Sequence, residues 1–479
     1  MRKVHFFFVC FLFVWVIAWE VAAQSSAVTL QRVPADFVDG PINNSTLYPS
    51  LSADGRFLSF FSNVNTLVPN DTNAIGDAFV LDRQTGQIER VSVTSAGAQA
   101  AFGACCSEYS VVLSGDGRYV AFSSFSNDLV PNDTNVAQDI FLHDRQTGVT
   151  SVVSVDSNGN PANGNSDYPS ISSNGRFIAF QSVATNLVPN DTNGFQDVFV
   201  HDTQTGQTTR VSITQDGQPS NHDSFITISR AISDDGRFIG FDSWASNLVP
   251  DDVNSVRDAF VHDRDADNDG IFDEPGATTT VRVSVATDGT EGNGHLSESY
   301  QPALAGNGRF VTFYSYATNL VPDDTNLALD VFVRDRDTDA DGIFDEPGAV
   351  LTERVSVSSS GGQSNGGSGW GSMTADGRFV TFYSSATNLI SGVNGAQQQI
   401  FLHDRQTGET IRLSETSSGD NPNNNSNGPM IAADGNVVAF TSLASNLTAG
   451  DTNQTFDLFV YDPGASAAGY QLYLPLVVR

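Results

Sequence analysis

The sequence predicts an all-β fold, a seven-bladed β-propeller built of four-stranded antiparallel blades. A segment of about sixty residues recurs seven times, and a period in this range is typical of repeat architectures. An Asp-Gly or Asn-Gly pair marks each copy, at positions 54–55, 116–117, 174–175, 235–236, 307–308, 376–377 and 434–435. The copies consist of short β-branched and aromatic runs without helical periodicity. A four-stranded unit cannot bury both of its faces alone, so stacking the copies around an axis is favoured.

The first copy shows the elements expected in every blade. The predicted strands cover residues 48–52, 56–62, 77–83 and 88–93. The pair Asp54-Gly55 favours the positive φ angles of a tight hairpin turn between the first two strands. A long polar loop separates the second strand from the third, and a short Gln-Thr-Gly turn precedes the fourth.

The N-terminal segment is expected to close the ring. Val28–Val33 matches the fourth strand of later copies, such as Ile88–Val91. Because this segment precedes the first full copy, it would supply the outer strand of the last blade and tie the ring shut by ladder pairing. The strand-like tail Gly469–Leu476 is the alternative candidate for that place.

The N-terminus is typical of a secretory signal, which we assign to residues 1–23. Arg2 and Lys3 precede an apolar run, and small residues follow it. A membrane anchor is less favoured, because the run is short for a span and no basic stop follows. We expect residues 24–463 to form the propeller and 464–479 a tail. The protein is predicted to be bacterial, secreted to the extracellular space or cell surface, monomeric, and without a transmembrane segment after signal cleavage.

The charge of the chain limits its partners. The formal net charge is −32, and the only lysine, Lys3, lies in the signal. Such a charge repels phosphate backbones, so nucleic acid is excluded as a partner. The adjacent Cys105 and Cys106 do not form a loop-closing disulfide, and a strained vicinal disulfide and no role at all are both open.

The strongest local signal is an acidic insert that occurs twice, in the connection between the third and fourth strands of copies four and five. Carboxylates stand at positions 1, 3, 5 and 9 of each insert, a glycine at 6 and a backbone carbonyl at 7, as in the start of a calcium loop. The candidate ligands are Asp265, Asp267, Asp269, Ile271 and Asp273 in the first insert and Asp337, Asp339, Asp341, Ile343 and Asp345 in the second. The inserts therefore predict Ca²⁺ as a cofactor.

These inserts differ from a true EF-hand. Gly276 and Gly348 stand at position 12 in place of the bidentate glutamate, and Glu274 or Glu346 is a candidate to complete the ligand set. The alternative is a solvated acidic loop, in which four close carboxylates would repel one another without a cation.

A weaker acidic pattern lies in the loop between the second and third strands. Asp71, Asn73 and Asp77 have counterparts in five other copies, and the sixth copy has lost both acids. The pattern fits either a cation in each blade or Asx turns that cap backbone N–H groups, and we favour the turns.

Other repeated polar residues are interpreted as architecture. His143, His201, His262 and His403 share a position that holds Leu81, Arg334 or Tyr461 in other copies. A position that tolerates such different side chains indicates packing. The arginine that follows six of the seven turns is expected to pair with a strand-end aspartate of its own or a neighbouring blade.

The irregular loops between copies hold the candidates for a ligand surface at the mouth of the central channel. These candidates are Cys105, Cys106, Glu108, His222, His295 and Trp370, together with the nearby Asp223, Glu298 and Tyr300. The topology of a propeller places these loops and the calcium inserts on opposite faces. Glu291 and Glu298 are conceivable as a glycosidase pair, but two acids in one loop favour catalysis only weakly.

The repeated motif Ser-x-Asp/Asn-Gly-Arg-Phe/Tyr, taken with Asp-x-Phe-Leu/Val-x-Asp-Arg, resembles the WD-like propeller repeat of the TolB type. The resemblance runs from about Val28 to Asp462, and it implies a periplasmic or extracellular platform for protein interactions, often six-bladed. Similar blades precede the hydrolase domain of prolyl oligopeptidase-like peptidases; no such domain follows here, so we do not expect peptidase activity. The seventh blade and the acidic inserts depart from TolB, and the inserts resemble the calcium loops of thrombospondin type 3 repeats.

Two functions follow as hypotheses, because fold alone does not decide between them. The first is a secreted, calcium-stabilised propeller that acts as a scaffold for an extracellular protein or polysaccharide. The alternative is an extracellular hydrolase or lyase with its active site at the channel mouth. Seven near-equivalent blade tops would favour the scaffold, and an asymmetric cluster of acids or histidines at one mouth would favour the enzyme.

Overall fold

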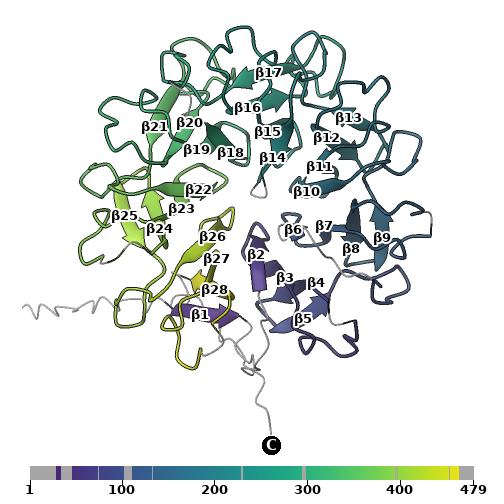
Figure 1. Ribbon diagram of the computed structural model, residues 1–479, viewed down its shortest axis with the longest axis horizontal. Coiled ribbons are helices and arrows are strands. Elements are labelled where there is room, and N and C mark those ends of the chain that lie inside the picture. Colours follow the sequence, from purple (N-terminus) through teal and green to yellow (C-terminus); the bar gives the residue numbers. More distant parts are fainter. Residues whose placement is uncertain are drawn as a thin grey trace, which may run out of the picture.

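Seven four-stranded antiparallel sheets form a closed ring around a central axis in the computed structural model (Figure 1). The structure describes residues 29–33, 46–73, 75–101, 111–131, 133–227, 230–293, 298–393, 395, 397–451 and 454–462. The predicted fold class, an all-β seven-bladed propeller, is therefore confirmed. Among the described residues, no helix is long and apolar enough to cross a membrane.

Blades 1 to 4 take their strands in chain order from the inner edge outward (Figure 1). Blade 1 contains β2 (Thr46–Leu51), β3 (Phe57–Ser62), β4 (Asp77–Asp82) and β5 (Gln87–Arg90). Blade 2 contains β6 (Val111–Leu113), β7 (Tyr119–Ser124), β8 (Asp139–Asp144) and β9 (Val149–Val152). Blade 3 contains β10 (Ser166–Ile171), β11 (Phe177–Ser182), β12 (Asp197–Asp202) and β13 (Thr208–Arg210). Blade 4 contains β14 (Ser224–Ile226), β15 (Phe238–Ser243), β16 (Asp258–Asp263) and β17 (Thr279–Arg282).

Blades 5 and 6 repeat this order, and blade 7 is completed by the N-terminal strand. Blade 5 contains β18 (Ser299–Leu304), β19 (Phe310–Ser315), β20 (Asp330–Asp335) and β21 (Leu351–Arg354). Blade 6 contains β22 (Ser368–Met373), β23 (Phe379–Ser384), β24 (Gln399–Asp404) and β25 (Glu409–Arg412). Blade 7 contains β26 (Ser426–Ile431), β27 (Val438–Ser442), β28 (Asp457–Asp462) and β1 (Thr29–Val33).

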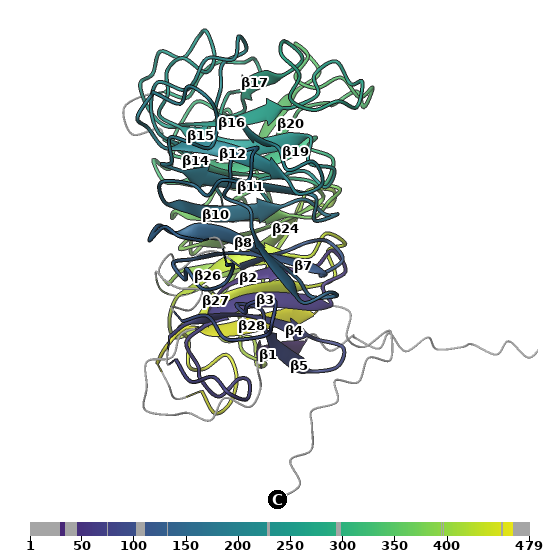
Figure 2. The same cartoon turned by 90° about the vertical axis from the view of Figure 1, so that its right-hand side faces the viewer.

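The ring closes through β1, as the sequence predicts. β1 pairs antiparallel with β28, from Thr29 opposite Asp462 to Val33 opposite Leu458. The competing tail at 469–476, the signal at 1–23 and the segment 464–479 lie outside the described residues. Seen edge-on, the ring is a disc whose strands run across its thickness (Figure 2).

The two central strands of every blade carry a phenylalanine pair that explains their burial. Phe60 stacks on Phe79 with a centroid separation of 5.7 Å. The other pairs are Phe122–Phe141, Phe180–Phe199, Phe241–Phe260, Phe313–Phe332, Phe382–Phe401 and Phe440–Phe459. Burying one such ring contributes about 1.5–3 kcal/mol.

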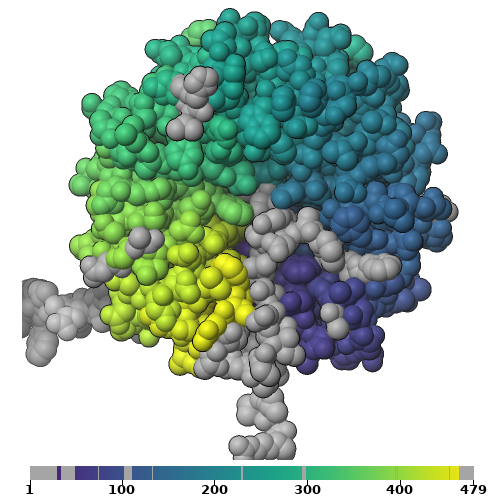
Figure 3. Space-filling model, in the orientation of Figure 1, coloured from purple at the N-terminus to yellow at the C-terminus, as the bar shows by residue number. Residues whose placement is uncertain are grey.

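The hydrophobic cores lie between neighbouring blades. One cluster joins Phe177 and Val198 of blade 3 to Ile226 and Phe241 of blade 4. The space-filling view shows the blades side by side around the ring, from the blue of blade 3 through teal to the green of blade 5 (Figure 3). No blade is a separate unit, because each core needs two of them.

The turns between first and second strands have one positive φ angle rather than two. In blade 4, Gly236 has φ 85°, while Asp235 does not share this conformation. The carboxylate of Asp235 instead accepts hydrogen bonds from Ser233 Oγ (2.6 Å) and Arg237 N (3.0 Å). The expected tight hairpin is thus a longer turn, in which the acid caps the backbone and only the glycine turns the chain.

The same turns join the blades around the channel by backbone hydrogen bonds. The donor and acceptor residues are Ala53 to Gly115, Gly115 to Ser173, Ser173 to Asp234, Asp234 to Gly306, Gly306 to Ala375, Ala375 to Ala433, and Asp434 to Ala53. The circuit returns to its first residue. It therefore ties all seven blades at one end of the channel.

Candidate functional site

The two acidic inserts each bring three carboxylates together. The cluster of the first insert consists of Asp265, Asp267 and Asp269, whose ligand atoms lie within 4.8 Å of one another. The second insert repeats it with Asp337, Asp339 and Asp341. In each cluster the first aspartate is buried and the other two are exposed. The inserts thus bring three of the four predicted acids of each loop to one place.

Backbone geometry holds the first cluster in shape. Asp265 accepts hydrogen bonds from the N–H groups of Asp269 and Gly270, both at 3.0 Å. Asp269 in turn accepts one from Ile271 N at 2.9 Å. Gly270 has φ 88°, a conformation that glycine adopts without strain. The second insert has the same bonds at Asp337, Asp341 and Ile343, and Gly342 has φ 89°.

In the second cluster, the two neighbouring carboxylates disfavour the charge of Asp339. Partial desolvation, followed by the negative charges of Asp341 and Asp337, raises the pKa of Asp339. A cation placed among the three groups would reverse this effect. The geometry is therefore suited to a cation.

The fourth acid of each insert lies elsewhere. Asp273 pairs with Arg264, whose Nε lies 2.9 Å from Oδ1. Asp345 pairs with Arg336 in the same way, with Nη2 2.6 Å from Oδ2. Neither residue belongs to the three-carboxylate cluster, and the side chains of Ile271 and Ile343 are exposed. The arginine that precedes each insert was the sequence signal for this pairing.

Each insert also packs on the preceding blade. Phe272 of the first insert lies against Phe177 of blade 3, with a centroid separation of 5.3 Å. The guanidinium of Arg264 lies 4.6 Å from the Phe177 centroid and 4.9 Å from that of Phe272. Thr209 of blade 3 donates to Asp273 Oδ2 at 3.0 Å. The insert therefore stabilises the contact between two blades, and it is also a candidate metal loop.

The loops between second and third strands contain Asx turns, as favoured. Asn193 Oδ1 accepts a hydrogen bond from Phe195 N at 3.1 Å, and Asn193 Nδ2 donates to Asp197 at 2.8 Å. The two acids of this loop also meet Arg210, which lies 3.0 Å from Asp191 and 3.1 Å from Asp197. Sequence reasoning missed this arginine, although it recurs at a fixed position of the fourth strand.

A third group of acids in the described residues surrounds the guanidinium of Arg282. It consists of Asp252, Asp258 and Glu291. Arg282 Nη1 lies 2.7 Å from Glu291 and 3.5 Å from Asp258. Glu291 also accepts hydrogen bonds from the N–H groups of Val253 and Asn254. These contacts give Glu291 a structural role in blade 4.

The histidines are packing residues, as predicted. His143, His201, His262 and His403 each place Nδ1 2.9 Å from a threonine hydroxyl of the neighbouring strand. Burial lowers the pKa of His201 to about 4, so the ring is neutral at pH 7. The turn arginines are confirmed as architectural too. Arg118 binds both oxygens of Asp144 within its own blade, at 2.9 and 2.7 Å.

Aromatic residues gather at the end of blades 4 and 5 that lies opposite the inserts. We call this group the aromatic surface; it consists of His222, Phe225, Trp244 and Tyr300 near Arg257, together with Tyr316, which interacts electrostatically with Tyr300. Trp244 is 39% exposed and Tyr316 44%. Its position follows from the two ends of β16. Trp244 directly follows Ser243, which pairs with Asp258 at the start of β16, whereas the insert follows Asp263 at the end of that strand.

Arg257 is the centre of the aromatic surface. Its guanidinium lies 4.1 Å from the Phe225 centroid, 5.2 Å from Tyr300 and 5.5 Å from Trp244. It pairs with the buried Asp242. Tyr300 donates to Glu298, and burial followed by that carboxylate raises the pKa of Tyr300. The aromatic surface therefore combines aromatic rings with the charged side chains of Arg257 and Glu298.

Five of the predicted ligand residues lie in the described part of the chain: His222, Asp223, Glu298, Tyr300 and Trp370. His222 belongs to the aromatic surface, where it stacks on Phe195 at 5.0 Å and meets Trp244 edge-on at 5.6 Å. Trp370 lies two blades away in β22 with φ 57°, at a bulged position that Tyr168 and Gln301 share in other blades. Cys105, Cys106, Glu108 and His295 lie outside the described residues.

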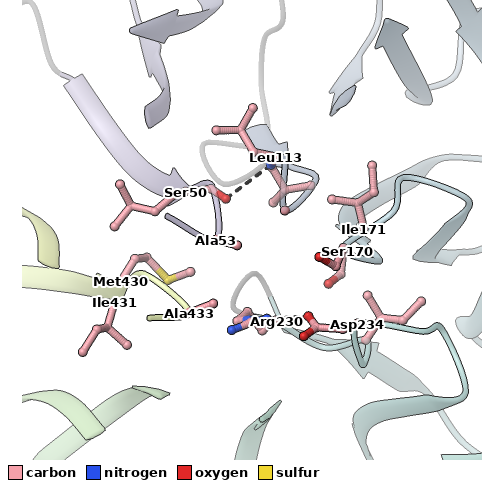
Figure 4. A pocket seen from close by; sticks show the side chains of 15 residues that line it. Ser50, Ala53, Leu113, Ser170, Ile171, Arg230, Asp234, Met430, Ile431 and Ala433 are labelled. Carbon is pink, nitrogen blue, oxygen red and sulfur yellow. Dashed lines mark hydrogen bonds and ion pairs between the residues drawn. The ribbon is translucent and has the colours of Figure 1, made fainter. Parts of the chain in front are cut away.

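The channel is narrow at the turn end. A cavity of about 50 Å³ lies there, bordered by Ser50, Leu113, Ser170, Arg230 and Met430 among others (Figure 4). Arg230 pairs with the neighbouring Asp234 at 2.6 Å on one side of this cavity (Figure 4). This volume holds a few water molecules.

Comparisons with known proteins agree on the fold alone. No protein-family model matches the chain, and no curated protein matches it. A solved oligogalacturonate lyase in complex with manganese is 14% identical, with a TM-score of 0.50 over 92% of this chain and 94% of that one. The β-propeller domain of the Trilobed protease from Pyrococcus furiosus is 11% identical, with a TM-score of 0.48 over 88% and 96%.

TolB from Acinetobacter baumannii is also among the similar structures. It is 13% identical, with a TM-score of 0.37 over 78% of this chain and 64% of that chain. This chain thus spans less than two thirds of that TolB. The structures similar to this protein therefore include TolB and other propeller proteins, and the molecule itself is a seven-bladed β-propeller.

Proposed function

We propose that the chain is a secreted, calcium-stabilised propeller that acts as a scaffold and binds an extracellular polysaccharide at its aromatic surface. The carrying observation is the exposure of Trp244, whose ring centroid lies 5.5 Å from the guanidinium of Arg257. Aromatic faces with a few placed polar groups are typical of ligand sites, and they suit the alternating apolar and hydroxyl faces of sugar rings. An extracellular protein is the other partner class, since aromatic and arginine side chains also dominate protein interfaces.

Calcium in this proposal is structural. The hard oxygen ligands of Asp265, Asp267 and Asp269 suit Ca²⁺, and the carbonyl of Ile271 and water would complete the shell. The same holds for Asp337, Asp339, Asp341 and Ile343. Because Arg264 and Arg336 anchor the inserts to the preceding blades, ions bound here would stiffen the junctions between blades 3, 4 and 5.

The binding experiment uses the mature chain in calcium. Retention on insoluble neutral polysaccharides is compared for the unchanged protein and Trp244→Ala, with Val183→Ala as control because Val183 holds the same position in blade 3. The proposal expects retention on at least one polysaccharide, lost in Trp244→Ala and kept in Val183→Ala. Equal retention of all three proteins would place binding elsewhere.

The alternative, an extracellular hydrolase or lyase, has one supporting observation. Glu298 accepts a hydrogen bond from Tyr300 beside Arg257, so the aromatic surface is asymmetric around the ring and contains an acid. An enzyme would release soluble fragments from a bound polysaccharide, and Glu298→Gln would stop the release while retention persists. Binding of the polysaccharide without release of soluble fragments would favour the scaffold function.

A further inference from the structure

Five blades hold an arginine between two acids at the outer edge of the ring. In each, Nη1 lies between Oδ1 of the loop aspartate and Oδ2 of the aspartate that begins the third strand. The ten distances run from 3.0 to 3.7 Å, for Arg32, Arg90, Arg210, Arg282 and Arg354. In each of these five blades, the two acids therefore share one arginine guanidinium.

Blade 6 shows that arginine and acids vary independently. It keeps the arginine as Arg412, but its strand begins with Gln399, and Nη1 lies 3.2 Å from Gln399 Oε1. Asn421 accepts a second bond from the same nitrogen. Neutral side chains thus satisfy this position of the fold, and a pair of acids is not required for folding.

Blade 2 is the reverse case. Val152 pairs with Phe141, where Arg90 pairs with Phe79 and Arg210 with Phe199. The two acids nevertheless remain, as Asp133 and Asp139. Blade 2 also lacks the glutamine that assists the acids in blade 1. Pro161 bridges Val155 at the position where Gln99 bridges Val93. In blade 1, Gln99 donates to both acids, at 2.8 and 3.2 Å.

Within the part of the chain that the structure describes, the acid pair of blade 2 is buried without a positive partner. Asp139 is fully buried and accepts hydrogen bonds from Ser154 (2.6 Å) and Asn135 (2.9 Å). Asp133 is 8% exposed, and within the described residues its Oδ1 has neither a hydrogen-bond donor nor an ion pair. That atom corresponds to the one that faces the arginine in the five other blades. A buried carboxylate oxygen without a partner is costly.

We propose that a divalent, oxygen-preferring cation binds between Asp133 Oδ1 and Asp139 Oδ2, in the place that the arginine nitrogen takes in other blades. Carboxylate oxygens are the preferred ligands of Ca²⁺ and Mg²⁺, and water would fill the remaining coordination positions. Burial, with a smaller contribution from the negative charge of Asp133, raises the pKa of Asp139 to about 6. A cation would lower it again. The site lies in blade 2 and is independent of the acidic inserts.

The test counts ions on the whole mature chain. Equilibrium dialysis against Ca²⁺, and separately against Mg²⁺, is run for the unchanged protein, Val152→Arg and Asp133→Asn. Asp191→Asn is the matched control, because its blade keeps Arg210. Melting temperatures of all four are recorded with metal and with chelator.

The unchanged protein is expected to bind one ion more than Val152→Arg and than Asp133→Asn, and Val152→Arg should melt higher in chelator. Asp191→Asn should keep the ion number of the unchanged protein. Because the result is a difference of one ion, it stands whether or not the inserts bind calcium. Equal ion numbers in the unchanged protein and Asp133→Asn overturn the proposal, also if Val152→Arg does not fold. A rise in the melting temperature of Asp133→Asn by the same amount with metal and with chelator would show that a proton neutralises the pair instead.

Discussion

The guanidinium of Arg336, in blade 5, lies over the ring of Phe238, in blade 4, at 4.8 Å from its centroid. Arg336 is 1% exposed, and it also donates to the carbonyl of Gly308 and binds Asp345. One side chain thus links the acidic insert, the turn of its own blade and the core of the blade before.

Replacing Arg336 should destabilise the ring. Arg336→Ala leaves Asp345 without its cation and uncovers Phe238, so we expect the free energy of unfolding to fall by about 3 kcal/mol. Urea denaturation measures the change. The control is Arg56→Ala, whose pair with Asp82 is exposed and should contribute less than about 1 kcal/mol. Similar losses in both variants would contradict the role of Arg336 between the blades.

The turn glycines are required for two reasons, and a matched pair separates them. A Cβ on Gly236 would lie 2.2 Å from Phe177 of blade 3, in addition to the strain of φ 85°. Gly217 has φ 78° with nothing within 4 Å of its Cβ position. We expect Gly236→Ala to cost more than about 2 kcal/mol and Gly217→Ala about 1 kcal/mol, by chemical denaturation. Equal costs would mean that the contact with Phe177 relaxes freely.

The two kinds of acid in an insert should respond differently to calcium. Asp267→Asn removes a cluster ligand, so it should lose one bound Ca²⁺ and the calcium-dependent part of its stability. Calcium at one hundred times Kd contributes about 2.7 kcal/mol. Asp273→Asn breaks the pair with Arg264 and should lower the melting temperature equally in calcium and in chelator. Calcium-independent melting of the unchanged protein would remove the metal assignment.

The buried histidines predict weaker stability in acid. Burial lowers the pKa of His201 from 6.5 to about 4, so the unfolded chain takes up a proton at a higher pH than the folded one. The contribution of this residue is complete above pH 6.5 and is lost as the pH falls to 4, up to about 3 kcal/mol. His201→Leu, which places in blade 3 the residue found as Leu81 in blade 1, should flatten this part of the stability curve. An unchanged slope would contradict the pKa shift.

Binding of polysaccharide should depend on Trp244. Loss of an exposed ring at the centre of a binding site is expected to weaken binding at least tenfold, about 1.4 kcal/mol. Affinity electrophoresis of Trp244→Ala against Val183→Ala checks this, and the melting temperature of both should change little because the two side chains are exposed. A loss in Val183→Ala alone would move the site to blade 3.

Several features could be predicted because they are periodic or local. The seven turn pairs, the phenylalanine and valine runs and the Val28–Val33 copy of a fourth strand lead to seven blades and their closure. The Asx turns follow from the Asp–Asn spacing, since their hydrogen bonds join near neighbours in the chain. The histidine position could be assigned to packing because the repeats themselves show which side chains it accepts.

The remaining contacts depend on how neighbouring blades pack together. Asp273 is next to three other acids in sequence, yet its partner is Arg264, and Thr209 of another blade completes the contact. The aromatic surface combines His222 and Trp244, from two loops of blade 4, with Tyr300 of β18 in blade 5, and these residues meet only when the two blades lie side by side. The sequence by itself thus determined the repeat, the strands and the acidic loops, because these depend on spacing along the chain. Only the tertiary structure decided which charges and rings meet, because their partners lie on other strands or in the next blade.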